Sequence, residues 1–290
     1  MATKKAASAA KKSGNKKPVA KKQATTKVTT VKAVESSPVE TVATAAPQNR
    51  RRTLKFGLNR TPLLGAMVAE FIGTFILAGA VIAGQGQPIL VFFALVGVVL
   101  TVGTISGGYV NPALVVGAWV TRRMDGMRAV AYIVAQVLGA MLALVVLDAY
   151  VNNAPANSAS LYGSAATLFK AAAIPHSKEW FLFLSEFLGT IIFGFAVAGA
   201  TREKKERTAA ALTVGLGAFL GLMIAGSSAA LLGGTSVLNP AVAVALQAVS
   251  FSSVWPVMVY VVGAALGGVI GFVAYDLVRG TGRAQDEETA

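Results

Sequence analysis

The chain has 290 residues, of which 54% are hydrophobic and only 13% charged, a balance too apolar for an ordinary soluble domain. It contains no Cys and a single His, His176, which excludes disulfide frameworks and multi-histidine metal sites within one chain. Residues 1–60 hold 15 Lys and Arg against 2 acidic residues, whereas residues 61–290 hold 11 of each, so the net charge of +13 belongs to a tail. No nucleophile–base pair, phosphate loop or metal cluster is visible, so we expect neither an enzyme nor a cofactor.

Residues 1–53 form the basic tail, which is rich in Lys, Ala, Thr, Ser and Val and has no aromatic residue. A segment of this composition buries too little apolar surface to offset its ordering entropy, so it is predicted to be disordered. We interpret it as a solvated cytoplasmic extension. Its spaced Lys-Lys pairs leave contact with anionic lipid or nucleic acid open.

Long apolar segments follow the tail. Most reach the ~20 residues that a helix needs to cross a hydrocarbon core of ~30 Å. Six such segments lie at about 62–83, 89–106, 128–150, 179–200, 209–230 and 254–277. Two shorter runs, about 111–120 and 239–249, are only half as long, so they are predicted to be re-entrant half-helices. The predicted fold is an all-α membrane protein with six transmembrane helices and two half-helices.

The charges in the loops predict the orientation. With the N-terminus inside, fourteen Lys and Arg residues face the cytoplasm, and only Lys170 and Lys178 lie outside. The bias predicts a multi-pass protein with both termini cytoplasmic, and we expect it in the cell (plasma) membrane. Residues 54–278 would form the channel domain, and residues 279–290 a short C-terminal tail.

The two halves of the chain repeat one pattern. Each half contains Asn-Pro-Ala, and one offset relates both the two motifs and the pair Tyr132 and Tyr260. Similar Glu-Phe-x-Gly-Thr sequences begin at Glu70 and Glu186. Repeat one covers about 62–150 and repeat two about 179–277. Each has three spans, an odd number, so the repeats are inverted and share a site near the bilayer midplane.

The paired motifs predict a pore. One half-helix would enter from each side, and the two N-termini would meet at mid-membrane. Proline in the first turn loses no helical hydrogen bond, and the helix dipoles and both Asn amides would point into the pathway. These groups bind a passing water or hydroxyl oxygen and oppose cations and protons. The predicted midplane site consists of Asn111, Pro112, Ala113, Asn239, Pro240 and Ala241.

Further motifs accompany the repeat, namely Ser106-Gly107-Gly108 and Ala131-Tyr132-Ile133-Val134-Ala135-Gln136. With them the sequence resembles the aquaporin and aquaglyceroporin (major intrinsic protein) family over about residues 62–278. The resemblance implies a right-handed six-helix pore, usually assembled as a homotetramer in membrane lipid, which passes water or small neutral solutes.

The sequence departs from this family at the outer constriction. The family usually has Arg after the second Asn-Pro-Ala, and this chain has Val242. We therefore expect a wider, uncharged constriction with relaxed selectivity toward solutes such as glycerol, urea or ammonia. Family spacing gives its candidate residues as Val91, Phe92, Phe93, Gly226, Ser227, Ser228, Thr235 and Val242. Tyr109 is a candidate for the inner vestibule.

Three polar residues fall inside the predicted spans: Glu70, Glu186 and Gln136. Ionisable residues there suggest function by default, and in a proton-coupled transporter Glu70 and Glu186 would carry the proton. The alternative, which the resemblance favours, is that all three are buried structural hydrogen-bonding groups. A passive channel is the preferred function; a coupled transporter, or a membrane anchor whose basic tail binds a partner, stays open.

Overall fold

The computed structural model describes residues 63–155, 158, 167–203, 205–251 and 253–288, all within one compact unit, Lys55–Ala290. The predicted tail at 1–53 and the first residues of the predicted channel domain lie outside the described residues. Every helix and turn discussed below belongs to this unit.

Within the described residues, six helices are long and apolar enough to cross a membrane, as the sequence predicted. Five of them are α1 (Leu63–Ala83), α2 (Pro88–Ser106), α4 (Gly126–Asn152), α5 (Glu179–Ala200) and α6 (Arg207–Ala230). The sixth span, Trp255–Gly280, combines α8 (Trp255–Val257), a π-helical segment η1 (Met258–Gly263) and the start of α9 (Ala264–Glu288). The predicted C-terminal tail, 279–290, is therefore helical as far as Glu288.

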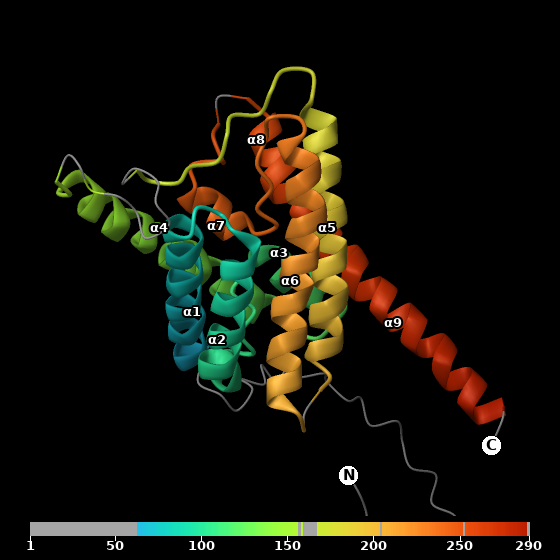
Figure 1. Ribbon diagram of the computed structural model, residues 1–290. Helices are drawn as coiled ribbons and strands as arrows, with labels where there is room; N and C mark the ends of the chain where they lie inside the picture. The colour runs from blue at the N-terminus through green and yellow to red at the C-terminus, as the bar shows by residue number, and fades with distance from the viewer. Residues whose placement is uncertain (1–62, 156–157, 159–166, 204, 252, 289–290) are drawn as a thin grey trace, which may run out of the picture. The chain divides into compact units, whose positions relative to one another are not determined.

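Two short helices, α3 (Pro112–Val120) and α7 (Pro240–Ala245), occupy the positions of the predicted half-helices (Figure 1). Each begins with the proline of an Asn-Pro-Ala motif. The helix α7 stops before the predicted end at 249, because the chain turns at Gln247, whose φ of 57° lies in the left-handed region. The fold class predicted from the sequence is confirmed.

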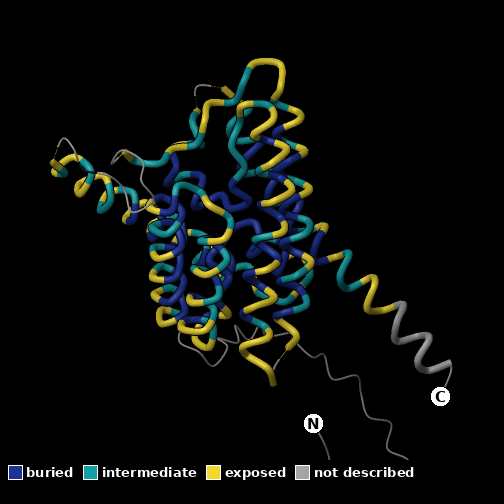
Figure 2. The backbone as a smooth tube through the Cα atoms, in the orientation of Figure 1, coloured by how far each residue is buried: buried dark blue, intermediate teal, exposed yellow. Residues whose placement is uncertain are grey.

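The helices pack in a pattern that relates the two halves. Within the first half α1 contacts α2 and α4, and within the second α5 contacts α6 and α9. Each short helix instead packs on the last long helix of the other half, α3 on α9 and α7 on α4. The buried backbone is concentrated in the interior, where α3 and α7 lie (Figure 2). This exchange places both Asn-Pro-Ala motifs in the shared interior.

Two glycines at equivalent positions allow the long helices to approach closely. A Cβ atom on Gly139 of α4 would overlap the carbonyl oxygen of Phe71 on α1. A Cβ atom on Gly267 of α9 would overlap the carbonyl oxygen of Phe187 on α5 in the same way. Small residues at such crossings let helix backbones pack directly, as is typical of helices in lipid.

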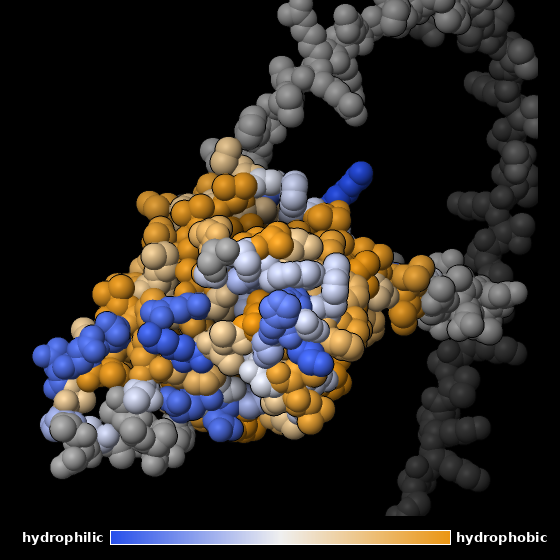
Figure 3. All heavy atoms as spheres, turned by 90° about the horizontal axis from the view of Figure 1, so that it is seen from above, coloured by the Kyte–Doolittle hydropathy of each residue, from blue (hydrophilic) through white to orange (hydrophobic). Residues whose placement is uncertain are grey.

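Large apolar side chains cover the outer faces of the spans. On α1, Ile72 and Ile76 are exposed one turn apart, and Leu216 and Leu220 repeat this spacing on α6. Seen from above, hydrophilic residues gather within a surface that is otherwise largely hydrophobic (Figure 3). Such an apolar exterior matches hydrocarbon rather than water, so this is a multi-pass integral membrane protein.

Candidate functional site

Each short helix is capped by the asparagine of its own motif. Asn111 and Asn239 have extended backbones, and their Oδ1 atoms accept hydrogen bonds from the N–H of Ala113 (2.9 Å) and Ala241 (3.0 Å). The prolines come next, at a position where no helical hydrogen bond is lost. The motifs therefore explain where α3 and α7 begin, and all six motif residues are buried.

The two asparagines also bond across the repeat. Nδ2 of Asn111 donates to the carbonyl oxygen of Leu238 (2.8 Å), and Nδ2 of Asn239 donates to that of Val110 (2.9 Å). Each bond joins one motif to the residue just before the other motif, so the helix starts face each other. A side-chain amide has two N–H donors, and this bond uses one of them.

The residues that receive these bonds have unusual backbones. Val110 has a φ of 41° and Leu238 a φ of 58°, both in the left-handed region that non-glycine residues seldom adopt. A conformation of this kind costs on the order of 1–3 kcal/mol and persists only where surrounding contacts enforce it.

Two buried carboxylates hold these strained turns. Glu70 accepts the N–H of Tyr109 at Oε1 (3.0 Å) and the N–H of Val110 at Oε2 (2.7 Å). Glu186 lies on α5 and accepts the N–H of Val237 (2.5 Å) and Leu238 (2.8 Å). Each carboxylate therefore satisfies two consecutive backbone donors in the turn that precedes a half-helix.

The third hydrogen bond comes from a different donor in each half of the chain. Nε2 of Gln136 donates to Glu70 (2.7 Å), whereas in the second half the hydroxyl of Ser236 donates to Glu186 (2.9 Å). Sequence reasoning selected Gln136 but missed Ser236, although Ser236 directly follows the chosen Thr235.

Two tyrosines brace the loops that lead into the motifs. The hydroxyl of Tyr132 donates to the carbonyl oxygen of Ser106 (2.8 Å), and that of Tyr260 donates to the carbonyl oxygen of Thr235 (3.0 Å). Both tyrosines are buried. Tyr132 and Tyr260, which the repeat offset relates in the sequence, therefore make corresponding hydrogen bonds to the loops of the two halves.

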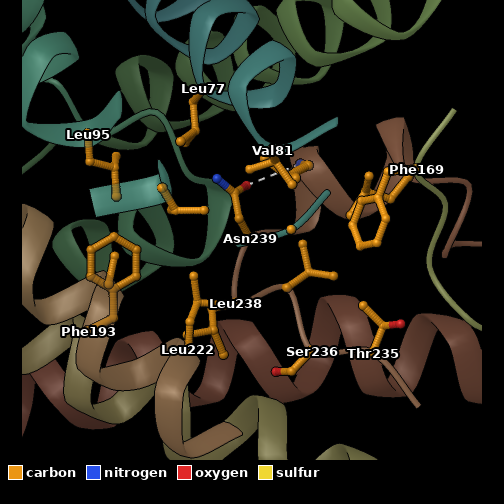
Figure 4. Close-up of a pocket in the computed structure, with 16 residues that line it drawn as sticks. Leu77, Val81, Leu95, Phe169, Phe193, Leu222, Thr235, Ser236, Leu238 and Asn239 are labelled. Carbon is orange, nitrogen blue, oxygen red and sulfur yellow. Dashed lines mark hydrogen bonds between the residues drawn. The ribbon is translucent and has the colours of Figure 1, made fainter. Parts of the chain in front are cut away.

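A narrow cavity of about 60 Å³ lies at the second motif. Asn239 lies among apolar side chains there, including Leu77, Leu95 and Phe193, while Thr235 contributes a hydroxyl (Figure 4). Among the described residues, none that lines this cavity is charged. The cavity is therefore a small, mostly apolar space whose polar lining residues are Thr235, Ser236 and Asn239.

Some of the predicted constriction residues line the narrow cavity and the others do not. Val91, Thr235 and Val242 line the narrow cavity. Phe92 packs edge-on against its neighbour Phe93, with ring centroids 4.9 Å apart, and the side chain of Phe93 is 63% exposed. On α2, only the first of three consecutive candidates lies among the residues that line the cavity.

The candidates on α6 lie outside the lining of the narrow cavity. Gly226, Ser227 and Ser228 are not among the described residues that line it, and both serines are exposed. The hydroxyl of Ser228 donates to the carbonyl oxygen of Ile224 in its own helix (2.8 Å). Instead α6 contributes Ala218 and Leu222, which are one turn apart.

Phe169, in the connection between α4 and α5, also lines the narrow cavity (Figure 4). The adjacent backbone is anchored to the loops around the second motif, since the N–H of Ala171 donates to the carbonyl oxygen of Leu246 (3.0 Å). The N–H of Ala172 likewise donates to the hydroxyl of Thr235 (2.9 Å). Sequence reasoning missed Phe169, because no local pattern marks a loop residue that reaches a distant cavity.

A second, wide cavity of about 440 Å³ lies next to the residues that precede the first motif. It is lined by Tyr109, the candidate for the inner vestibule, together with Tyr132 and the turn that precedes the first motif. Along α2 the lining passes from Leu95 in the narrow cavity to Val99 in the wide one within a single turn. The two cavities therefore follow one another along the same helices.

Comparisons with known proteins agree with this arrangement. The family model described as major intrinsic protein matches residues 57–275. The chain is 31% identical to Aquaporin NIP1-1 of Zea mays over 244 residues, which cover 79% of each chain. It is also 31% identical to Glycerol uptake facilitator protein-like 6 of Lactiplantibacillus plantarum over 51% of this chain and 69% of that protein.

A solved structure supports the fold. The X-ray structure of the aquaglyceroporin from Plasmodium falciparum matches with a TM-score of 0.54 at 21% sequence identity, over 74% of this chain and 96% of that one. The capped half-helices, the inverted repeat and the extent of the family match lead to one conclusion: this chain belongs to the major intrinsic protein family.

Proposed function

We propose that this chain is a passive transmembrane channel for water and small neutral solutes. The observation that carries the proposal is the pair of crossed asparagine bonds, which hold two amide groups where the half-helices meet. Each amide keeps a second N–H donor for a passing oxygen atom, and the helix N-termini add positive potential against cations. The pathway would run through the narrow cavity, past both motifs, into the wide cavity.

Selectivity would be set in the narrow cavity and would be relaxed compared with a water-only pore. Val242 occupies the place where the family usually has Arg, and it lines the cavity together with Phe169 and Thr235. An uncharged lining lowers the cost of moving a larger neutral solute through, so we expect glycerol, urea or ammonia to pass. The names of the similar proteins, which include aquaporins and a glycerol uptake facilitator, support this range.

The buried polar groups would be structural rather than proton carriers. Glu70 and Glu186 each accept three hydrogen bonds within the protein. Neither glutamate is among the described residues that line the two cavities. A carrier that exchanges protons with the pathway needs access to it, so this placement favours a channel over a coupled transporter. The chemistry of a pore also requires no enzymatic step and no cofactor.

Topology and assembly complete the proposal. The bias of loop charges supports cytoplasmic termini, which makes the wide cavity the inner one, and we expect the protein in the plasma membrane. The family resemblance supports a homotetramer in membrane lipid. The basic residues 1–53 would contact anionic lipid or nucleic acid, and the channel would function without them. The anchor hypothesis instead requires that deletion of residues 1–53 abolishes activity.

Stopped-flow light scattering on proteoliposomes tests this function. Vesicles that contain the full chain are expected to shrink faster than empty vesicles in an osmotic gradient, and to re-swell as glycerol or urea enters. Equal rates with and without protein would rule out a channel. Fast water flux with every larger solute excluded would retain the channel but contradict the relaxed selectivity.

A further inference from the structure

A short part of the connection between α4 and α5 reaches the narrow cavity. We call residues 168–172 the strap. Phe169 of the strap lines the cavity and lies on the opposite side of it from Leu95 and Phe193 (Figure 4). An aromatic ring in this position limits the cross-section of a space of only about 60 Å³. The contacts that hold the ring in place therefore bear on which solutes can pass.

Two hydrogen bonds attach the strap to the residues on either side of α7. The N–H of Ala171 donates to the carbonyl oxygen of Leu246, which follows α7 (3.0 Å). The N–H of Ala172 donates to the hydroxyl of Thr235, which precedes α7 (2.9 Å). The first bond uses a backbone oxygen, which any residue at position 246 would supply. The second uses a side chain, so the identity of residue 235 decides whether it forms.

Thr235 is itself held by the sixth span. Its carbonyl oxygen accepts a hydrogen bond from the hydroxyl of Tyr260, which lies in η1 and is buried (3.0 Å). This bond fixes the backbone from which the Thr235 side chain projects. A threonine hydroxyl has one donor and two acceptor positions, and the bond from Ala172 uses one acceptor position. Thr235 therefore connects a buried residue of the sixth span to the strap.

The ring of Phe169 lies directly against a glycine in the turn between α1 and α2. Gly86 also lines the narrow cavity, and its φ of 69° lies in the left-handed region. A Cβ atom on Gly86 would lie 2.7 Å from Cζ of Phe169, well inside the contact distance of two carbon atoms. The ring is therefore enclosed between the strap that carries it and the turn at Gly86.

We propose that Thr235 is a positioning residue for solute selection. Its hydroxyl holds the strap, the strap holds the ring of Phe169 against Gly86, and the space left beside the ring determines which solutes larger than water can pass. Thr235 thus acts on selectivity through Phe169 rather than through its own contact with the solute. The effect on flux rests on the channel function proposed above, whereas the attachment of the strap does not.

Hydrogen exchange of the full-length protein in detergent tests the attachment without any flux. Thr235→Val keeps the branched shape of the side chain but removes the acceptor, whereas Thr235→Ser keeps the acceptor. We expect Thr235→Val to speed exchange of the Ala172 amide about fivefold, as for the loss of one hydrogen bond, and Thr235→Ser to leave it unchanged. The amide of Val115, which bonds within α3, is the internal control. Unchanged exchange at Ala172 in Thr235→Val would overturn the proposal.

Solute flux in proteoliposomes tests the consequence for selectivity. We expect Thr235→Val to raise the ratio of glycerol flux to water flux about as much as Phe169→Ala does, and Thr235→Ser to leave the ratio unchanged. The decisive variant combines Thr235→Val with Phe169→Ala. It should match Phe169→Ala alone, because the strap then carries no ring to position. If Thr235→Val changes the ratio equally with and without the ring, Thr235 acts directly on the solute and the proposal is wrong.

Gly86→Ala tests the opposite side of the ring. The added methyl group crowds Phe169 in the cavity lining, so we expect the ratio of glycerol flux to water flux to fall. Gly233→Ala is the matched control. Its φ of 74° gives the same backbone strain, but its Cβ atom would lie 4.0 Å from the nearest atom, which belongs to Pro175. An equal fall in Gly233→Ala would attribute the effect to strain and would contradict the contact with the ring.

The two kinds of measurement separate this inference from the channel function. A protein that passes neither water nor glycerol, but whose Ala172 amide exchanges faster in Thr235→Val, would remove the channel and support the attachment of the strap. Normal flux, with neither the exchange nor the flux ratio altered in Thr235→Val, would retain the channel and overturn the role of Thr235.

Discussion

Nδ2 of Asn239 donates a hydrogen bond to the carbonyl oxygen of Val110, 2.9 Å away, across the two halves of the chain. Val110 is held in the left-handed region, and its own N–H is bound by Glu70. The strained turn, the carboxylate and the amide of the opposite motif thus form one unit. Its counterpart runs from Asn111 through Leu238 to Glu186. The turn before each half-helix therefore depends on a hydrogen bond from the asparagine of the other half.

This relationship predicts the effect of Asn239→Asp. A carboxylate keeps the cap to Ala241 but loses the Nδ2 donor and faces the carbonyl oxygen of Val110. We expect the free energy of unfolding to fall by roughly 1–3 kcal/mol and water flux to fall with it. Thermal unfolding in detergent and stopped-flow shrinkage measure the two effects. The control is Asn153→Asp, where an exposed Nδ2 donates to the carbonyl oxygen of Ala149 (2.8 Å); an equal loss there would contradict the prediction.

The carboxylates give a second prediction. Glu186→Gln replaces one acceptor oxygen with an NH2 group, which faces a backbone N–H, so Val237 or Leu238 loses its bond. We expect roughly 1–3 kcal/mol of destabilisation, and flux through the folded fraction that does not respond to a pH gradient. Glu179→Gln, at the start of α5, is the control and should change neither quantity. Solute uptake driven by a pH gradient in the unsubstituted protein, and abolished by Glu186→Gln, would favour the coupled transporter instead.

The narrow cavity gives a third prediction. Val242→Arg introduces a long cationic side chain into a space of about 60 Å³ with no charged residue among its described lining. We expect glycerol and urea flux to be lost and water flux to fall less, since water is the smallest solute. Because Val242 is buried, Val242→Leu provides a second, milder variant, with the half-buried Val244→Leu as its control. Unchanged solute flux in a folded Val242→Arg protein would mean that Val242 does not line the path.

Phe169 gives a fourth prediction. Phe169→Ala removes an aromatic ring from the lining of the narrow cavity while leaving the backbone bonds of Ala171 and Ala172 in place. We expect glycerol flux to rise relative to water flux. The neighbouring Leu168→Ala is a matched control, because Leu168 packs against the core without being among the residues described as lining the cavity. A glycerol-to-water ratio that is the same in both variants would exclude Phe169 from the filter.

The difference between predicted and observed lining residues has a simple cause. Family spacing placed the α6 candidates at Gly226, Ser227 and Ser228, whereas the structure has Ala218 and Leu222 in the narrow cavity. Gly226 is four residues after Leu222, so it lies on the same face of α6 one turn farther along, whereas Ser227 and Ser228 point about 100° and 200° away, because successive residues on a helix differ by about 100°. The same effect separates Val91 from the exposed Phe93 on α2.

The spans, the half-helices and the repeat could be predicted from the amino-acid sequence, because apolar length, helix-capping residues and internal repetition are visible without knowledge of how the helices pack. The contacts between distant groups could not be predicted in this way: the crossed hydrogen bonds of Asn111 and Asn239 and the position of Phe169 in the lining of the narrow cavity are visible only in the folded structure. These depend on how helices far apart in sequence are rotated and packed against one another. No local pattern encodes that rotation, since it is set by close contacts such as that of Gly139 with the backbone of Phe71.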